Sequence, residues 1–264
     1  MKAIKIAIIG GTGVYRADML ESAHNEKINT EYGDTELLCG TYKGKEVFFL
    51  ARHGSGHTVP PHLINYRANI QALKNLGVEK IIATAAVGSL NEKMRPGEII
   101  LTDQFLDFTK NRTSSFYEGG AKGILHVDMT EPYCRELRED IYNISIEADI
   151  PVKMGGCYVT AEGPRFETPA EIKMYKMLGG DLVGMTSVPE VVLAREAGMC
   201  YATLAMVTNY ASGITGNPLS HTEVIKAMAE SGQRMSELIM CLIEKIPDKR
   251  NCRCKFAAQE AEPF

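Results

Sequence analysis

Short runs of β-branched residues alternate with longer segments of helical periodicity along nearly the whole chain, and this alternation restricts the fold most. Residues 4–9, 46–51 and 80–85 have strand character, whereas 66–76 carries apolar residues at helical spacing and ends at Gly77, a typical helix stop. The same patterns predict strands at 98–105, 155–161, 182–185 and 200–208, and helices at 131–148, 169–178, 189–197 and 222–246. We therefore expect an α/β fold with helices on both faces of the sheet.

The chain has 264 residues, 45% of them apolar, which suffices for one large α/β unit. No segment rich in Pro, Gly or Ser divides the sequence, and no internal repeat is visible. These features predict a single domain over residues 1–247. Residues 248–264 are polar and lack periodicity, so we expect a flexible C-terminal tail.

Charge and hydropathy exclude several classes of partner. The formal net charge is −4, and Lys and Arg form no long runs, which argues against nucleic-acid binding. Residues 1–10 place two lysines before an apolar run, but the run is short and stops at Gly10 and Gly11, as a first buried strand would. No stretch approaches the ~18 apolar residues of a membrane span. We expect a cytoplasmic protein without a membrane partner.

The seven cysteines are odd in number and scattered, and no secretion signal precedes them, so we expect reduced thiols. Cys252 and Cys254 are the only close pair. They lie in the polar tail without a neighbouring pair that would complete a four-ligand zinc site, so we predict no metal site in this chain.

Glycines and polar residues follow the first strand in a pattern that suits an anion. In Gly10-Gly11-Thr12-Gly13, backbone N–H groups can approach a phosphate closely, and the Thr12 hydroxyl adds a donor. A tight turn without a ligand explains the same residues. A dinucleotide fingerprint does not, because Arg16 stands where the third glycine is required.

Two further strand ends carry candidate phosphate ligands. Arg52 and His53 follow the strand at 46–51, where a guanidinium fork and an imidazole could hold an anion, although a surface ion pair of Arg52 is the alternative. After the strand at 80–85, small side chains at Ala85 and Ala86 expose backbone N–H groups, which also suits close packing alone.

Two loops carry groups suited to a heterocyclic base. Phe166 can stack on a ring and Glu167 can accept a ring N–H, although glutamate is also favoured at a helix N-terminus. Asn209 follows a buried strand and offers one donor and one acceptor, which fits a purine edge with a 6-carbonyl and N7. A buried asparagine that only fixes a loop is the alternative.

Taken together, these segments resemble the trimeric family of purine nucleoside phosphorylases and methylthioadenosine phosphorylases. The resemblance covers residues 5 to about 246. Its motifs, in order, are GGTGVY, ARHG, ATAAVGSL, DQFLDFT, GPRFET, GMTSVPEVVLAREAG and MVTNYASG. Each short motif is weakly specific, whereas the ordered set is strong.

The resemblance implies a single-domain fold with a central, mixed, twisted and partly barrel-like sheet flanked by helices. It also implies a role for each candidate residue. The phosphate ligands would be Thr12, Arg52, His53, Ala85, Ala86 and Thr186, with Arg52, His53 and Asn209 as the catalytic groups. Met185 would lie under the ribose, Phe166 would stack on the base, and Glu167, Asn209 and Ala211 would surround its edge. His126 would reach into a neighbouring subunit, so the resemblance implies a homotrimer or a dimer of trimers.

The implied reaction is phosphorolysis in purine salvage. The glycosidic bond lengthens first, and the enzyme stabilises charge as it develops on the purine and the ribosyl group. Inorganic phosphate then closes on C1′ as a co-substrate, so we expect neither a metal nor another cofactor.

Three positions bear on the nucleoside. Methylthioadenosine phosphorylases carry Asp-x-Asp where this chain has Asn209-Tyr210-Ala211, and a serine where it has Glu167. Near the last helix, an apolar residue of the 5′ pocket is replaced by His221, which could bond a 5′-hydroxyl or instead face water. These differences favour the 6-oxopurine nucleosides inosine and guanosine. Methylthioinosine or methylthioadenosine phosphorylase is the alternative.

Three other classes of protein fit the sequence less well. An NAD-dependent oxidoreductase lacks support because the glycine fingerprint is broken. A nucleoside hydrolase would act without phosphate and would carry an Asp-rich metal site, of which the sequence gives no sign. A nucleoside-binding module without catalysis would have no reason to place a phosphate site beside a sugar pocket.

Overall fold

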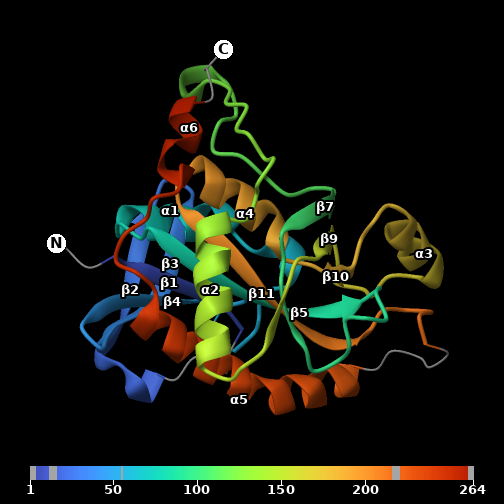
Figure 1. Cartoon of the computed structure of the whole chain (residues 1–264). Helices are drawn as coiled ribbons and strands as arrows, with labels where there is room; N and C mark the ends of the chain where they lie inside the picture. The colour runs from blue at the N-terminus through green and yellow to red at the C-terminus, as the bar shows by residue number, and fades with distance from the viewer. Residues whose placement is uncertain (1–3, 12–16, 55, 216–220, 261–264) are drawn as a thin grey trace.

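The structure is a computed structural model that describes residues 4–11, 17–54, 56–215 and 221–260, with the backbone alone for 17 and 221–231. In the described part of the chain, eleven strands form one mixed sheet, with helices packed on both of its sides (Figure 1). The predicted α/β fold with a mixed sheet is therefore confirmed. No helix of the described residues is both long and apolar enough to cross a membrane.

The strands are β1 (Ile6–Gly10), β2 (Glu21–Thr30), β3 (Gly33–Tyr42), β4 (Lys45–Ala51), β5 (Lys80–Ser89), β6 (Ile99–Leu101), β7 (Gln104–Phe108), β8 (Val152–Met154), β9 (Cys157–Ala161), β10 (Leu182–Gly184) and β11 (Cys200–Tyr210). The helices are α1 (Tyr66–Asn75), α2 (Arg135–Glu147), α3 (Pro169–Met177), α4 (Ser187–Glu196), α5 (His221–Lys245) and α6 (Ala257–Glu260). The predicted helices thus all occur, with ends shifted by a few residues.

Besides the short strand β8, which was not predicted, two parts of the sheet differ from the sequence prediction. The hairpin of β2 and β3 was not expected, because β2 is polar and almost wholly exposed and so lacks a buried face. The strand predicted at 98–105 is divided into β6 and β7. Thr102 donates its backbone N–H to Thr203, whereas Asp103 donates to Gly156, so the chain passes from one sheet branch to another at this point.

The sheet branches at β5, and part of one edge of this strand has no partner among the described strands; we call this unpaired stretch the opening. β11 pairs with β5 over nearly its full length, from Lys80 to Ser89. On the other edge, β1 pairs with β5 only as far as Ala83, and β10 begins to pair at Gly88. The edge between these two points therefore faces the ends of β1 and β10, where strand order changes and α/β sheets commonly bind ligands.

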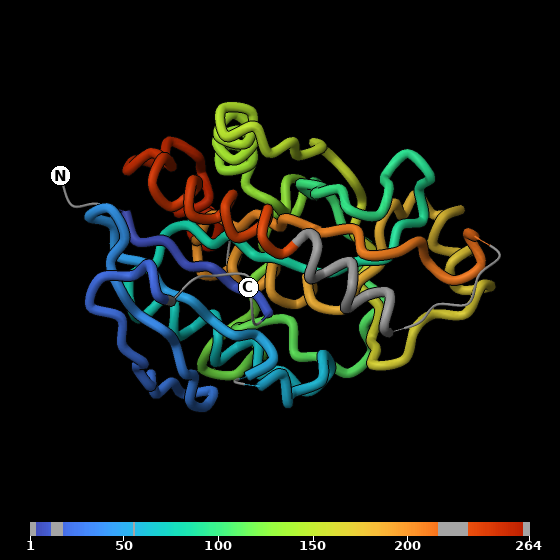
Figure 2. Tube along the Cα trace, turned by 90° about the horizontal axis from the view of Figure 1, so that it is seen from below, coloured from blue at the N-terminus to red at the C-terminus, as the bar shows by residue number. Residues whose placement is uncertain are grey.

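Two large apolar clusters hold the helices onto this sheet. One contains buried residues of α2, α5 and the inner strands, and the other contains residues of α1 and α4. Seen from below, α5 lies across one face, the β2–β3 hairpin is at one end of the molecule and α3 is at the opposite end (Figure 2). The two clusters fix the strands whose ends form the opening.

The segment after residue 247 runs back from α5 to α6 (Figure 1). Cys254 and Ala257 of this segment are buried, and Arg250 donates to the Gly198 carbonyl at 2.8 Å. Lys80 also donates to the Lys249 carbonyl at 3.3 Å. The segment is therefore packed on the domain in this structure, and its predicted flexibility stays a prediction.

Candidate functional site

Arg52 lies directly after β4, and its guanidinium reaches the opening beside β5. The side chain is almost completely buried and forms a two-pronged pair with Glu190 of α4, with Nε–Oε2 and Nη2–Oε1 distances of 2.8 Å. Nη1 donates to the Thr84 carbonyl at 2.9 Å. Burial opposes the charge of Arg52, but the Glu190 carboxylate outweighs it and raises the pKa. The cation is therefore permanent.

Three of the five N–H donors of Arg52 are used in this way, so one donor on Nη1 and one on Nη2 remain for an anion. Glu190 is itself held by the Tyr201 hydroxyl, which donates to Oε1 at 2.7 Å. Arg52 is thus not the surface ion pair of the alternative interpretation, but an oriented buried cation.

His53 is half-buried beside Arg52. Its Nδ1 lies 2.8 Å from the Val59 carbonyl, which can only accept, so Nδ1 carries the proton. Burial lowers the pKa of His53 to about 4, and the charge of Arg52 acts in the same direction. At neutral pH, Nε2 is therefore an acceptor. As an acceptor, Nε2 suits the hydroxyl of a monoprotonated phosphate rather than a fully ionised phosphate oxygen.

The remaining phosphate candidates border the same opening. Ala85 and Ala86 lie on the edge of β5 between its pairings with β1 and β10. Thr186 follows β10, is buried, and occupies the N-cap of α4 without using its side chain to cap the helix. Thr12 lies outside the described residues.

Met185 lies between Thr186, a phosphate candidate, and the loop that contains Gly163. It precedes Thr186, and a Cβ placed on Gly163 would lie 2.5 Å from its sulfur, so the Met185 side chain packs against the backbone of the Gly163 loop. Arg112 ties the two segments together, because its Nη1 donates to the Met185 carbonyl and its Nη2 to the Glu162 carbonyl, both at 2.6 Å. A ligand that extends from Thr186 to the Gly163 loop would therefore lie against Met185.

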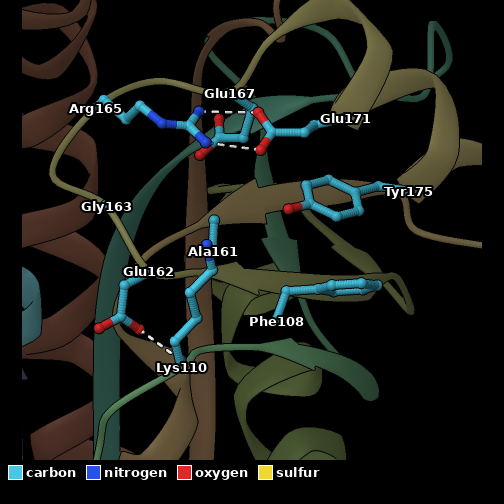
Figure 3. A pocket seen from close by; sticks show the side chains of 9 residues that line it. All are labelled: Phe108, Lys110, Ala161, Glu162, Gly163, Arg165, Glu167, Glu171 and Tyr175. Carbon is cyan, nitrogen blue, oxygen red and sulfur yellow. Dashed lines mark hydrogen bonds and ion pairs between the residues drawn. The ribbon is translucent and has the colours of Figure 1, made fainter.

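A cavity of about 110 Å³ lies beside the Gly163 loop, which forms part of its lining. Figure 3 shows Phe108 and Tyr175 on one side, with ring centroids 4.6 Å apart, and Arg165 paired with Glu171 above them. Its lining is Phe108, Lys110, Ala161, Glu162, Gly163, Arg165, Glu167, Glu171 and Tyr175. The cavity combines aromatic faces with carboxylates, as a heterocyclic base requires.

Glu167 is the buried acid of this cavity. Its side chain lies near Arg165 in Figure 3, but Arg165 donates to Glu171 through both terminal nitrogens, from Nη2 at 2.7 Å and from Nη1 at 2.9 Å. Burial raises the pKa of Glu167. Phe166, the expected stacking residue, is 43% exposed and is not part of the cavity lining. Its stacking role stays a prediction.

Asn209 lies near the end of β11, where a bulge shifts the register between Val207 and Asn209. Its Oδ1 accepts from the Thr208 hydroxyl at 2.7 Å, and its Nδ2 donates to the Tyr210 carbonyl at 2.8 Å. One N–H and one lone pair of the amide remain for a ligand. Ala211 is buried next to it and belongs to the same apolar cluster as Tyr175 of the cavity.

Two further residues belong to the predicted substrate site. His126 is exposed in an irregular segment before α2. His221 is the first residue of α5, but its side chain is outside the described part. Both roles stay predictions.

Sequence reasoning missed the residues that hold the ligand groups in place. Glu190 is fully buried, although the sequence shows it only as an acid in the otherwise apolar run VPEVV. Arg112 belongs to no motif, yet it bonds three different segments. An isolated charge in an apolar run was the one available signal for Glu190.

The prediction for the cysteine pair is wrong in one respect. Cys252 and Cys254 do have a second pair nearby, because Cys134 and Cys200 bring their sulfurs within 4.8 Å of them. These residues are far apart in the sequence, so only chain folding reveals the group.

The chain is similar to known proteins over almost its whole length. The model of the "Phosphorylase superfamily" matches residues 5–244. The chain is 54% identical to a probable 6-oxopurine nucleoside phosphorylase from Moorella thermoacetica, covering 98% of this chain and 100% of the relative. It is 50% identical to the 6-oxopurine nucleoside phosphorylase of Pyrococcus furiosus, covering 97% and 98%. A methylthioadenosine phosphorylase structure from an Antarctic soil metagenomic library superposes with a TM-score of 0.92 at 36% identity, covering 99% and 93%.

Proposed function

The chain belongs to the phosphorylase superfamily, and we propose that it is a purine nucleoside phosphorylase acting on 6-oxopurine nucleosides. It would convert inosine or guanosine reversibly to the free base and ribose 1-phosphate, with inorganic phosphate as co-substrate and no other cofactor. One observation carries the proposal. Arg52 is paired with Glu190 of α4, Met185 packs against the Gly163 loop, and Glu167 lines the cavity beside that loop, so that phosphate, sugar and base would follow one another in this order.

The same residues explain how the reaction would be accelerated. Two N–H donors of Arg52 and the Thr186 hydroxyl would position phosphate, while Nε2 of His53 accepts its proton. As the glycosidic bond lengthens, negative charge grows on the purine. Asn209 would then bind N7 and O6, and Glu167 would accept N1–H. These bonds strengthen as charge develops, so they stabilise the transition state more than the bound substrate.

Base choice follows from hydrogen-bond chemistry. A 6-oxopurine presents N1–H as a donor, which matches the Glu167 carboxylate. Adenine has an unprotonated N1 and a 6-amino donor, so it would leave polar groups unpaired at about 1–3 kcal/mol each. The relatives that share about half of this sequence carry the name 6-oxopurine nucleoside phosphorylase, which supports the same substrate class.

The second candidate is a methylthioinosine or methylthioadenosine phosphorylase. The close superposition on a methylthioadenosine phosphorylase favours it. The two candidates differ at the 5′ end, where we assign His221 to a 5′-hydroxyl, and at the base, where Asn209 and Glu167 argue against adenine.

The deciding measurement is release of free base from inosine, adenosine and methylthioinosine, each with and without phosphate. We expect release from inosine that depends on phosphate, with adenosine nearly inert. A large preference for methylthioinosine would retain the base site and remove the assignment of His221. Release without phosphate would contradict the phosphorylase itself.

We also propose that the protein is a homotrimer, or a dimer of trimers, in which His126 contributes to a neighbour's sugar site. The exposed position of His126 in an irregular segment supports this arrangement. Light scattering coupled to size-exclusion chromatography gives the mass of the assembly. A monomeric, fully active enzyme would contradict the proposal.

A further inference from the structure

Four cysteine side chains from three distant parts of the chain meet on the side of the domain near α6. Cys134 is the N-cap of α2, Cys200 is the first residue of β11, and Cys252 and Cys254 belong to the segment after α5. Their four sulfurs all lie within 4.8 Å of one another, and three of the residues are buried. All four are free thiols, with Cys200 and Cys252 in closest contact at 3.2 Å between sulfurs.

Independent contacts on every side fix this convergence. The backbone N–H of Asn251 donates to the carboxylate of Glu136 in α2 at 3.0 Å. Arg250 bonds the Gly198 carbonyl just before β11, and the backbone N–H of Cys134 donates to the Tyr201 carbonyl at 2.9 Å. The cluster is therefore built by the fold and does not depend on contacts between the sulfurs.

The surroundings favour negative charge on sulfur. The Leu137 backbone N–H points at the Cys134 sulfur at 3.5 Å, in the first turn of α2, where the helix dipole is positive. Arg195 places Nη1 at 3.6 Å from the Cys254 sulfur. Such N–H groups commonly support the ligands of a metal from outside the coordination shell.

We propose that Cys134, Cys200, Cys252 and Cys254 form a structural site for one soft divalent cation, Zn²⁺, bound by four thiolates. Tetrahedral zinc with Zn–S bonds of about 2.3 Å places its sulfurs about 3.8 Å apart, which the cluster can reach with small side-chain shifts. Binding replaces four S–H bonds by four Zn–S bonds and releases four protons. The bound group carries a charge of −2, which Arg195 and the helix dipole offset.

This site is separate from the proposed phosphorolysis, and its role would be to fasten the C-terminal segment to α2 and β11. A second group of potential ligands, His24, Glu26 and Cys39, is weaker because two of its members are exposed. In contrast, the four-cysteine cluster offers one kind of soft ligand in a largely dry environment, which selects zinc over magnesium or calcium.

The test is metal content and cobalt spectroscopy on the whole chain. Protein purified with a thiol reductant and dialysed against Zn²⁺ is expected to retain roughly one ion per chain. Substitution with Co²⁺ is expected to give sulfur-to-cobalt charge-transfer absorption and the visible bands of a tetrahedral ion. Cys252→Ser should lose both signals, whereas Cys157→Ser, which removes a half-buried thiol outside the cluster, should keep them.

A chelator should lower the melting temperature of the wild type and of Cys157→Ser, but not that of Cys252→Ser. Reduced wild-type protein that retains no stoichiometric Zn²⁺ and gives no charge-transfer band with Co²⁺ would overturn the proposal, whatever the stability of the variants. So would an intact mass lower by about two or four units without reductant, together with no metal binding after reduction, because the cysteines would then be paired as disulfides.

Discussion

The carboxylate of Glu190 holds the guanidinium of Arg52 through two hydrogen bonds of 2.8 Å, in a place where neither side chain is more than 3% exposed. The pair fixes the plane of the guanidinium, and two of its N–H donors remain for a ligand. Glu190 touches no substrate in our proposal, so it is a positioning residue. Its effect should appear in phosphate binding rather than in base recognition.

We expect Glu190→Gln to raise KM for phosphate roughly 10- to 100-fold, because charge-assisted hydrogen bonds of about 1.5–3 kcal/mol are lost. The KM for inosine should change much less, and the melting temperature should fall because Arg52 loses its buried partner. Glu196→Gln is the matched control. Glu196 is a buried acid of the same helix that binds Ser115 and the Phe116 backbone instead. Equal effects of both variants on phosphate KM would contradict the positioning role.

Replacement of Asn209 tests base recognition. Asn209→Asp removes the amide donor and supplies an acceptor suited to a 6-amino group, so we expect kcat/KM for inosine to fall and the adenosine-to-inosine ratio to rise at least ~10-fold. Steady-state kinetics with the two nucleosides measures this ratio. Asn143→Asp, at an exposed position of α2, controls for the added charge. An unchanged ratio would remove Asn209 from the base site.

Glu167 gives a prediction about pH. Burial raises its pKa, and it must be ionised to accept N1–H, so kcat/KM for inosine should fall on the acid side at a pH above the ordinary glutamate range. Glu167→Gln should lower activity on inosine and remove this acid limb. Glu171→Gln is the control, because that carboxylate is already occupied by Arg165. A limb that persists in Glu167→Gln belongs to another group.

Glu167→Gln should change the stability of the protein in the opposite direction to its activity. A buried carboxylate with a raised pKa costs stability when it is ionised, so stability linked to Glu167 decreases as pH rises through that pKa. Glu167→Gln should therefore melt at a higher temperature than the wild type at neutral pH while being less active. Calorimetric scans at several pH values measure this. A loss of both stability and activity would indicate a packing defect instead.

His53 predicts a separate dependence of stability on pH. Its pKa is about 4 in the folded chain, below the ordinary value of 6.5, so between these values the unfolded chain binds a proton that the folded chain does not. The contribution is fully present above about pH 6.5 and is lost as pH falls towards 4. His53→Gln should flatten the stability curve in this window, whereas His24→Gln, at an exposed site, should not. Parallel curves for wild type and His53→Gln would contradict the assigned burial.

Much of the fold follows from local sequence patterns. The helices were predictable because apolar spacing and stop signals such as Gly77 act over a few residues. The polar strand β2 was not, because its place is set by hydrogen bonds to β3 and not by a buried face. Motifs at strand ends indicated Arg52, Glu167 and Asn209, since strand ends in α/β sheets carry ligand groups.

What the sequence by itself determined was the chemical inventory: an arginine, a glutamate and an asparagine at strand and loop ends, within an α/β framework. Only the tertiary structure decided which groups support them. Glu190 binds Arg52, which lies 138 positions away in the sequence. Arg112 joins the Met185 segment to the Gly163 loop. Cys134 and Cys200 meet Cys252 and Cys254 of the segment after α5. Hydrogen bonds and thiolate ligation act over a few ångströms in space, and sequence separation does not encode that distance until the chain is folded.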